Sequence, residues 1–338
     1  EKHLGKTYKN PSVGCVVVKN NTIISSAVTS INGRPHAEYN ALNKKIDFKN
    51  SDMYVTMEPC SHFGLTPPCI NIIKKKKIKN VYYTFDDPDE RTFKKAKKFL
   101  SKIKKLNKNK KENKNFYKSY YLNKIKKFPL IDAKIAVSND LSTINKKSRW
   151  ITNSRSRKVA QLLRSKYDCI ISTSRSINKD NSLLNCRIEG LNNYKPDLII
   201  IDRNLKLSQR SKLLDISSKR KTYIFTESKD KKKIFFFKKK NVNIIKIERL
   251  IYKKDFKDLF KKIFQMGKGR ILIETGLTFL NELMKFKLID DLYLFKSNLI
   301  LKNMGCNNSS VNLIRKLRLN NRVKVNLEKD KLYKIKLK

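Results

Sequence analysis

Pro35-His36-Ala37-Glu38 is followed in this chain by Glu58-Pro59-Cys60 and, after eight intervening residues, by Cys69. One imidazole and two thiols make a set of zinc ligands, and three protein ligands leave the fourth position of the metal open, as catalytic zinc sites do. Glu38 stands two residues after the histidine, where a carboxylate can move protons beside the metal. We therefore expect zinc bound by His36, Cys60 and Cys69, with Glu38 as the catalytic acid–base group.

The order of these residues is that of zinc deaminases, whose signature is H-x-E followed by P-C and a second cysteine. Zinc makes hydroxide available near neutral pH, and Glu38 would pass its proton to the ring nitrogen and the departing amine. Cys69 opens an expected helix, whose N-terminus favours the thiolate that zinc requires. Two alternatives stay open, namely a closed structural site with His62 as fourth ligand and a chance arrangement without metal.

The hydrophobic pattern predicts alternating strands and helices, and therefore an α/β fold built in layers. In the first part we expect strands over 13–18, 22–27, 53–56 and 81–85 and helices over 36–43, 69–75 and 93–103. In the second part we expect strands over 131–137, 169–172, 198–202, 222–226, 242–247, 270–274 and 291–295, helices over 154–164, 256–266 and 278–285, and a closing hairpin of 322–327 and 331–337. A G-x-G-x-x-G fingerprint is absent from the sequence, which weakens a Rossmann-type dinucleotide site.

Length and composition favour two domains separated by a polar segment. At 338 residues the chain is long enough for two hydrophobic cores. Residues 105–127 are rich in Lys and Asn and show little periodicity. We therefore place a linker at 105–127, between a zinc deaminase domain at 1–104 and a second α/β domain at 128–338.

The formal net charge of +50 invites a nucleic-acid interpretation. However, the excess lies in Lys, accompanied by frequent Asn and Ile, whose codons are all A/T-rich, and the lysines are spread along the chain. We interpret the charge as compositional bias and expect no nucleic-acid partner, although the positive field suits a phosphorylated substrate. The sequence shows neither a long apolar membrane span nor an apolar signal segment, so we expect a cytoplasmic protein without a membrane partner.

Longer segments of the chain resemble one known family. The segments Asn10–Val18 (NPSVGCVVV), Pro35–Glu38 (PHAE) and Tyr54–Cys69 (YVTMEPCSHFGLTPPC) are similar to the bifunctional riboflavin-biosynthesis deaminase/reductase. Nucleic-acid and cytidine deaminases typically have two residues between the cysteines, whereas this chain has eight. Ser148–Thr152, Gln161–Arg164 and Ile273–Gly276 resemble segments of the family's reductase.

The resemblance implies a cytidine-deaminase-like three-layer domain followed by a dihydrofolate-reductase-like domain. It implies deamination of 2,5-diamino-6-ribosylamino-4(3H)-pyrimidinone 5′-phosphate, then reduction of the ribosyl group to ribityl with NADPH, in a homo-oligomer (dimer or tetramer). The reductase substrate would contact Ser148, Arg164, Leu184, Arg187 and Glu274, with the two arginines as phosphate clamps. The cofactor would contact Ala136, Trp150, Ser176, Asp180, Arg203 and the turn and helix Gly276, Leu277, Thr278, Phe279, Leu280, Asn281 and Glu282, whose N–H groups suit an anion.

The second domain departs from the family pattern at several positions. Ser138-Asn139-Asp140-Leu141-Ser142 stands where S-L-D-G-R is usual, and Leu277 stands where Pro is usual. Ala136 and Leu141 replace Gly and add a Cβ where a cofactor passes closely. A rival hypothesis is therefore a deaminase whose reductase-like domain is degenerate, and a second rival is a basic RNA-binding or RNA-editing deaminase.

Overall fold

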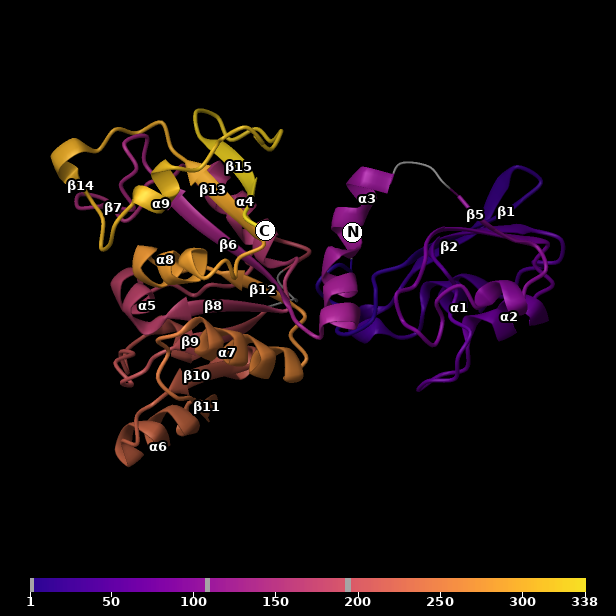
Figure 1. Ribbon diagram of the computed structural model, residues 1–338, viewed down its shortest axis with the longest axis horizontal. Helices are drawn as coiled ribbons and strands as arrows, with labels where there is room; N and C mark the ends of the chain where they lie inside the picture. The colour runs from indigo at the N-terminus through magenta and orange to yellow at the C-terminus, as the bar shows by residue number, and fades with distance from the viewer. Residues whose placement is uncertain (1–2, 107–109, 192–195) are drawn as a thin grey trace. The chain divides into compact units, whose positions relative to one another are not determined.

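The computed structural model describes residues 3–106, 110–191 and 196–338. The chain forms two compact units, Glu1–Phe128 and Pro129–Lys338, and Figure 1 follows it from the first unit in indigo to the second in orange and yellow. Each unit has its own sheet, so the α/β class expected from the sequence is confirmed. In the described part of the chain, no helix has both the length and the apolar composition that crossing a bilayer requires.

The first unit is built on a five-stranded sheet of order β2-β1-β3-β4-β5. Its strands are β1 (Gly14–Lys19), β2 (Thr22–Val28), β3 (Asp52–Met57), β4 (Asn80–Phe85) and β5 (Ile103–Lys105). β1 pairs antiparallel with β2 and β3, whereas β3, β4 and β5 run parallel. The predicted first hairpin turns at Asn20 and Asn21, whose φ values of 49° and 59° are typical of a type I′ turn.

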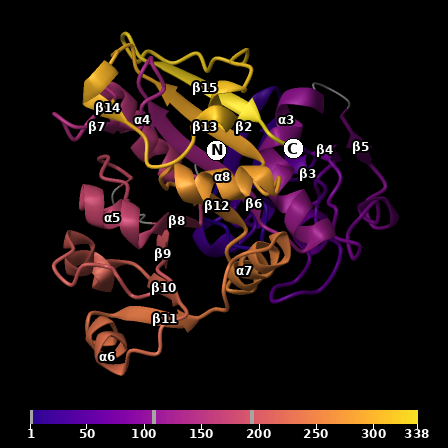
Figure 2. The ribbon, with the colours of Figure 1, turned by 60° about the vertical axis from the view of Figure 1, so that its left-hand side comes forward.

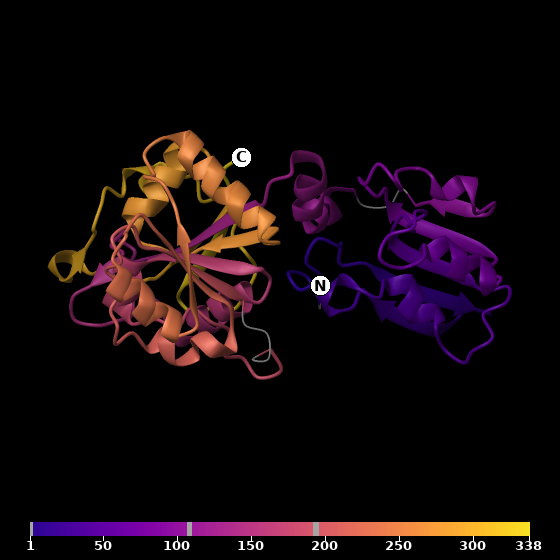
Figure 3. The same cartoon turned by 90° about the horizontal axis from the view of Figure 1, so that it is seen from below.

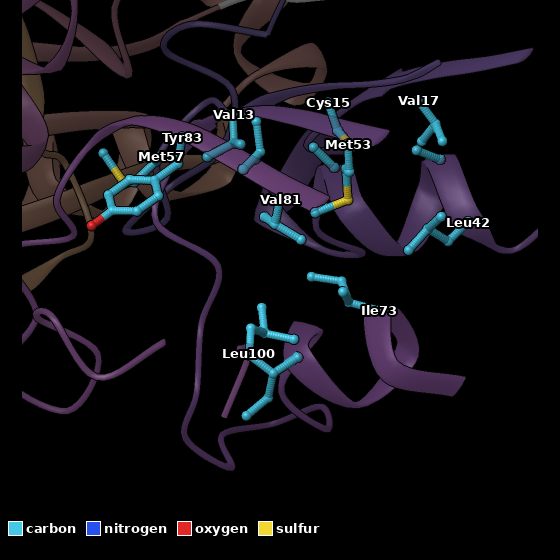
Figure 4. Close-up of a cluster of buried hydrophobic side chains, with 14 of the residues drawn as sticks. Val13, Cys15, Val17, Leu42, Met53, Met57, Ile73, Val81, Tyr83 and Leu100 are labelled. Atoms are coloured by element: carbon cyan, nitrogen blue, oxygen red, sulfur yellow. The ribbon is translucent and has the colours of Figure 1, made fainter. Parts of the chain in front are cut away.

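The core of the first unit follows the alternation of its strands. Val13, Cys15 and Val17 are buried, as are Met53 and its alternate neighbours on β3, and Figure 4 shows these side chains converging with Ile73 and Leu100. Helices α1 (Ala37–Leu42) and α2 (Cys69–Lys75) contact each other, and α1 also packs on β1 and β2. The remaining elements are short turns η1 (Ile31–Gly33) and η2 (Ala96–Lys98), helix α3 (Lys110–Tyr121) and the π-turn η3 (Leu122–Lys126).

Two predictions for the first part are wrong. The helix expected over 93–103 is reduced to the single turn η2, because Lys94 takes a left-handed φ of 54° and Ile103 pairs with Val81 in the sheet. The segment expected to be a linker at 105–127 is largely helical. Tyr117 and Tyr120 of α3 are buried in the core of the first unit, so much of this segment is part of that unit.

The second unit contains an eight-stranded sheet of order β11-β10-β9-β8-β12-β6-β13-β15. All neighbouring pairs run parallel except β13 and β15. The strands are β6 (Leu130–Val137), β8 (Cys169–Thr173), β9 (Asp197–Ile201), β10 (Thr222–Thr226), β11 (Val242–Lys246), β12 (Arg270–Ile273), β13 (Asp291–Lys296) and β15 (Lys331–Lys336). A small separate sheet joins β7 (Ile144–Asn145) to β14 (Gly305–Cys306).

Helices cover both faces of this sheet, as Figure 3 shows. They are α4 (Ser154–Arg164), α5 (Ser174–Asp180), α6 (Lys231–Lys239), α7 (Lys253–Gln265), α8 (Leu277–Lys285) and α9 (Asn312–Arg315), with turns η4 (Lys212–Lys219) and η5 (Lys302–Met304). Figure 2 places α6 beside the edge strand β11, with which it packs. The central strands β8 and β9 are buried along most of their length, as parallel strands covered on both faces are.

The closing hairpin of 322–327 and 331–337 is only partly present. Arg322 and Tyr333 form an isolated bridge, whereas β15 pairs along its length with β13. Residues between Arg322 and Tyr333 contact the start of α4 instead, since Asn153 donates to the carbonyl of Leu327 (2.7 Å). Asp330 accepts from the Asn153 N–H (2.9 Å) and thus fixes the same helix end.

Tyr117→Ala should lower the free energy of unfolding of the first unit by about 3–5 kcal/mol, because it removes a ring that is only 3% exposed. Asn115→Ala, an exposed position of α3, is the matched control and should change stability by less than about 0.5 kcal/mol. Urea unfolding of the full chain followed by circular dichroism measures both. The fluorescence of Trp150, the only tryptophan of the chain, should report unchanged unfolding of the second unit. Equal free energies of unfolding for the two variants would show that α3 does not contribute to the core of the first unit.

Candidate active sites

Three elements of the first unit bring the predicted zinc ligands together. His36 is the N-cap residue of α1, Cys60 follows the carboxyl end of β3, and Cys69 is the first residue of α2. Their ligand atoms all lie within 4.8 Å of one another. His36 Nδ1 is 3.6 Å from Cys60 Sγ and 3.5 Å from Cys69 Sγ.

These separations fit a tetrahedral zinc site. With Zn–S of about 2.3 Å and Zn–N of about 2.0 Å, a tetrahedral angle places N and S about 3.5 Å apart. Two buried atoms at the site, His36 Nε2 and Glu38 Oε2, have no hydrogen-bond partner among the described residues. An unpaired buried carboxylate oxygen beside a group of thiols indicates that a polar species belongs there. The residues present therefore fit a zinc ion.

The electrostatics of the group distinguish the two cysteines. A hydrogen bond with Cys69 lowers the pKa of Cys60, while the same bond and burial raise the pKa of Cys69. Both cysteines must become thiolates to bind a metal ion, so metal binding at this site would release protons. Glu38 is 3% exposed, and burial raises its pKa to about 7.

His62 does not join this group. Its Nδ1 lies 2.9 Å from Thr92 Oγ1, and the metal-ligating set found in the described residues contains only His36, Cys60 and Cys69. The arrangement therefore favours the open, three-ligand site over the closed one.

The loop that follows β4 carries a polar network that sequence reasoning missed. Glu58, 3% exposed, accepts the N–H groups of Lys94 (2.9 Å) and Ala96 (3.2 Å). Asp89 accepts a bidentate pair from Arg91 at 2.9 and 2.7 Å and a bond from Lys124 at 2.8 Å. The motif Glu58-Pro59-Cys60 was the available signal, since a carboxylate beside a zinc ligand in a buried turn needs donors.

Helix α3 holds the same loop from the other side. Tyr120 donates to Asp87 Oδ1 (2.8 Å), and Tyr121 donates to the carbonyl of Asp86 (2.8 Å). Tyr117 shares a hydrogen bond of 2.6 Å with Thr56, which is on β3 just before the zinc-binding turn. The end of β3, just before the turn with Cys60, and the loop after β4 are thus both held by a helix far along the chain.

In the second unit, most predicted site residues follow the carboxyl ends of parallel strands. Glu274 follows β12, Ser176 lies in α5 directly after β8, and Arg203 follows β9. Parallel strands end at the same edge of a sheet, and ligands of open α/β sheets bind at that edge. The predicted residues are therefore gathered at one edge by the topology.

The predicted phosphate clamp Arg164 has an internal partner. Its Nε and Nη2 bind the two oxygens of Glu274 at 2.6 and 3.0 Å, and its Nη1 donates to the carbonyl of Asn185 at 3.0 Å. Arg187 is exposed and donates to Asn185 Oδ1 at 3.0 Å. Burial and the neighbouring Arg164 and Arg149 lower the pKa of Arg187. A dianion would relieve this repulsion between guanidinium groups.

The other predicted substrate residues differ in exposure. Leu184 is buried and takes a left-handed φ of 48°, which is unusual for leucine. Ser148 is exposed, and its Oγ accepts the N–H of Trp150 at 3.2 Å.

The turn at Gly276 fits an anionic cofactor group. Gly276 is the N-cap of α8 and provides no side chain to cap the helix, so the first N–H groups of α8 are available for a phosphate. The N–H of Gly276 itself donates to Ser176 Oγ at 3.0 Å. A Cβ at this position would lie 2.9 Å from Asn308 Nδ2, so a larger residue here would require the Asn308 side chain to move.

The predicted cofactor residues of α8 are not equivalent. Leu277, Leu280 and Asn281 are buried. Asn281 donates to the carbonyl of Ser310 at 2.7 Å. Thr278, Phe279 and Glu282 are not buried.

Trp150 and its neighbours form a cationic surface. The guanidinium groups of Arg149 and Arg157 lie 4.8 and 4.6 Å from the Trp150 ring, which is 47% exposed. Arg149 also donates to the carbonyl of Asp180.

Arg203 is paired with Glu227. Ala136 lies at the carboxyl end of β6, opposite Phe295 of β13.

The departure from Gly at position 141 leaves a trace in the backbone. Leu141 has a φ of 65°, the left-handed region that favours glycine. Ser138 accepts the N–H of Leu141 through its carbonyl (3.1 Å) and donates its own N–H to the carbonyl of Ser142 (2.9 Å), which closes the turn. The turn conformation typical of glycine is thus retained with a leucine in it.

Lys134 on β6 is a residue that the sequence analysis missed. Its Nζ lies 3.8 Å from Glu274 Oε2, and burial lowers its pKa. A lysine in the middle of an apolar strand was the available signal, since buried lysines are rare unless paired.

Known protein families match both units of the chain. The RibD C-terminal domain family matches residues 129–308, and the cytidine and deoxycytidylate deaminase zinc-binding region matches residues 1–85. The chain is 32% identical to the riboflavin biosynthesis protein RibD of Buchnera aphidicola over 88% of this chain and 83% of that protein. It is 30% identical to the RibD protein of Actinobacillus pleuropneumoniae over 81% of this chain and 74% of that protein.

Solved structures have the same fold. The diaminohydroxyphosphoribosylaminopyrimidine deaminase/5-amino-6-(5-phosphoribosylamino)uracil reductase of Thermotoga maritima matches with a TM-score of 0.81 at 25% identity, over 99% of this chain and 94% of that chain. A RibD structure from Acinetobacter baumannii matches with a TM-score of 0.82 at 24% identity, over 98% of this chain and 94% of that chain. The two predicted domain types are thereby confirmed.

Taken with the zinc-ligand geometry, these matches mean that the chain belongs to the RibD family of riboflavin biosynthesis proteins, bifunctional enzymes with a zinc-binding deaminase domain and a reductase domain.

Proposed function

We propose that the first unit deaminates 2,5-diamino-6-ribosylamino-4(3H)-pyrimidinone 5′-phosphate and that the second reduces the ribosyl group of the product to ribityl. The similarity to the Thermotoga maritima deaminase/reductase supports this pair of reactions. The observation that carries the proposal is the convergence of His36, Cys60 and Cys69 on one point beside Glu38.

In the deamination, the chain positions one proton carrier beside a metal. A bound zinc ion makes hydroxide available near neutral pH. Glu38, buried and with Oε2 unpaired, is placed to hold the proton released from water and to pass it to the ring nitrogen and the leaving ammonia. The loop held by Glu58 and α3 forms part of the surroundings of the site.

In the reduction, three buried charged side chains carry the protein's part of the chemistry. NADPH supplies a hydride to the ribose carbon. Lys134 is placed to give a proton to the ribose oxygen that becomes a hydroxyl group, and its lowered pKa makes it a better acid than an exposed lysine. Glu274 orients Lys134 while Arg164 balances the charge of Glu274.

This cluster favours an active reductase over a degenerate one. Lys134, Arg164 and Glu274 are all largely withdrawn from water, with side-chain exposures of 20%, 13% and 6%. Buried ionic clusters often stabilise a fold less than apolar side chains of similar volume do, so their retention supports a function. The left-handed turn at Leu141 is the one observation that favours a degenerate reductase.

The charge and the cysteines of the chain bear on its partners and its location. A phosphorylated pyrimidine suits the cationic surroundings of Arg187, and no nucleic-acid partner is needed to account for the lysines. All six cysteines are without disulfide partners, which supports a reducing compartment and hence the cytoplasm. We also propose that the protein forms a homo-oligomer, either a dimer or a tetramer.

Glu38→Gln should keep one zinc ion per chain and lose ammonia release by about 10²–10⁴-fold, because the amide cannot carry the proton. Elemental analysis and an ammonia assay with the diaminopyrimidine phosphate measure the two properties. NADPH oxidation with the deaminated product is the internal control and should not change. Full ammonia release by this variant would exclude the mechanism.

His36→Ala and His62→Ala form a matched pair that separates the open from the closed zinc site. The first change should abolish zinc binding, whereas the second should leave one zinc per chain, because His62 is hydrogen-bonded to Thr92 and lies outside the ligand set. Zinc content after dialysis measures both. Loss of zinc from His62→Ala would establish a fourth protein ligand.

Lys134→Met should lower NADPH oxidation by about 10²–10⁴-fold while ammonia release is unchanged. In the unmodified chain the rate of reduction should fall as the pH rises through the pKa of Lys134, since the protonated amine is the acid. Because burial lowers this pKa, the fall should begin below about pH 10.4, the value of an ordinary lysine. A normal rate in Lys134→Met would assign the proton donor elsewhere.

A further inference from the structure

Residues 183–187 of the second unit form a segment without regular structure, whose middle is buried and whose last residue, Arg187, is exposed. Leu184, Asn185 and Cys186 are 6%, 4% and 0% exposed, and Leu184 takes the left-handed φ of 48°. The carbonyl groups of such a segment need donors from elsewhere, because the segment belongs to neither a helix nor a sheet.

Arg220 supplies those donors from a distant point of the sequence. It is the residue that ends η4, just before β10, and it is 7% exposed. Its Nη1 donates to the carbonyl of Leu184 at 2.7 Å and to that of Pro196 at 3.4 Å, and its Nη2 donates to the carbonyl of Leu183. The rigid fork of a guanidinium is needed to reach several carbonyls at once.

The same segment is held on its other side by α4. Arg164 donates to the carbonyl of Asn185 at 3.0 Å, and Gln161 accepts the N–H of Arg187 at 2.9 Å. Arg187 in turn donates to Asn185 Oδ1 at 3.0 Å. The position of Arg187 and of the Asn185 side chain therefore depends on the backbone that Arg220 fixes.

Burying the charged guanidinium group of Arg220 costs free energy. In the described part of the chain its hydrogen bonds go to carbonyl groups only, and its Nε has no partner there. Burial and the nearby Arg164 lower its pKa to about 10. A buried cation without a bonded carboxylate is a poor way to stabilise a fold, so the shape of the segment is what it secures.

We propose that Arg220 is a positioning residue of the reductase, which fixes residues 183–187 so that Asn185 and Arg187 meet the phosphorylated pyrimidine. The inference rests on the proposed reductase function. Arg220 itself contacts neither reactant in this proposal and acts through the carbonyls of Leu183 and Leu184.

Arg220→Lys keeps the charge and removes the fork, and Arg210→Lys makes the same change at an exposed position of the same unit. In the full chain, Arg220→Lys should raise the KM for the deaminated pyrimidine phosphate about tenfold, because bonds to a charged group are lost. The KM for NADPH, the kcat for reduction and the rate of ammonia release should stay within about twofold of the unmodified chain. Arg210→Lys should change none of these quantities.

The alternatives give different results. A merely structural role would lower kcat through loss of folded reductase and leave both KM values unchanged, and that outcome overturns the proposal, as does an unchanged KM for the pyrimidine. If Arg220→Lys does not fold, Asn185→Ala is the deciding variant and should raise the same KM with NADPH binding unaffected. An unmodified chain that oxidises no NADPH would instead refute the reductase function itself.

Discussion

Parallel pairing of strands is the constraint on which both sites depend. In parallel neighbours the carboxyl ends lie at one edge, so residues that follow different strands meet there. In the first unit this brings the turn with Cys60, after β3, beside the loop with Asp87, after β4. In the second unit it gathers the residues that follow β8, β9 and β12. Two unrelated chemistries thus use one geometric principle, and each places its charged groups where the sheet ends.

The sequence predicted best where the chemistry is local. His36, Cys60 and Cys69 lie within one short region, and their residue types alone specify a metal, so the ligand set could be found before the fold. Strands with simple alternation were equally clear. The helix expected over 93–103 failed because Lys94 takes a left-handed φ and Ile103 pairs with Val81, far away in sequence, in the sheet. Periodicity contains no information about such long-range pairing.

The sequence did not reveal which charged residues are buried, for a related reason. Lys134 and Arg220 are among 79 lysines and arginines, and in so basic a chain a cation is expected to be exposed. Only the fold distinguishes the few that are enclosed. Leu141 shows the opposite situation, since its departure from the family pattern was visible in the sequence, whereas the retained left-handed turn was not. The basic composition therefore hid Lys134 and Arg220 as functional candidates. The retained turn at Leu141 makes its departure from the family pattern less important than the sequence suggested.

The tyrosines of α3 have a consequence for how the chain folds as it is synthesised. The first unit cannot complete its core until Tyr117 and Tyr120 have left the ribosome, although its sheet ends at Lys105. Domains generally fold in order from the N-terminus during synthesis. Here the last buried residues of the first unit emerge shortly before Pro129, where the second unit begins. Closure of the deaminase core and the appearance of the first reductase strand are therefore almost simultaneous events in translation.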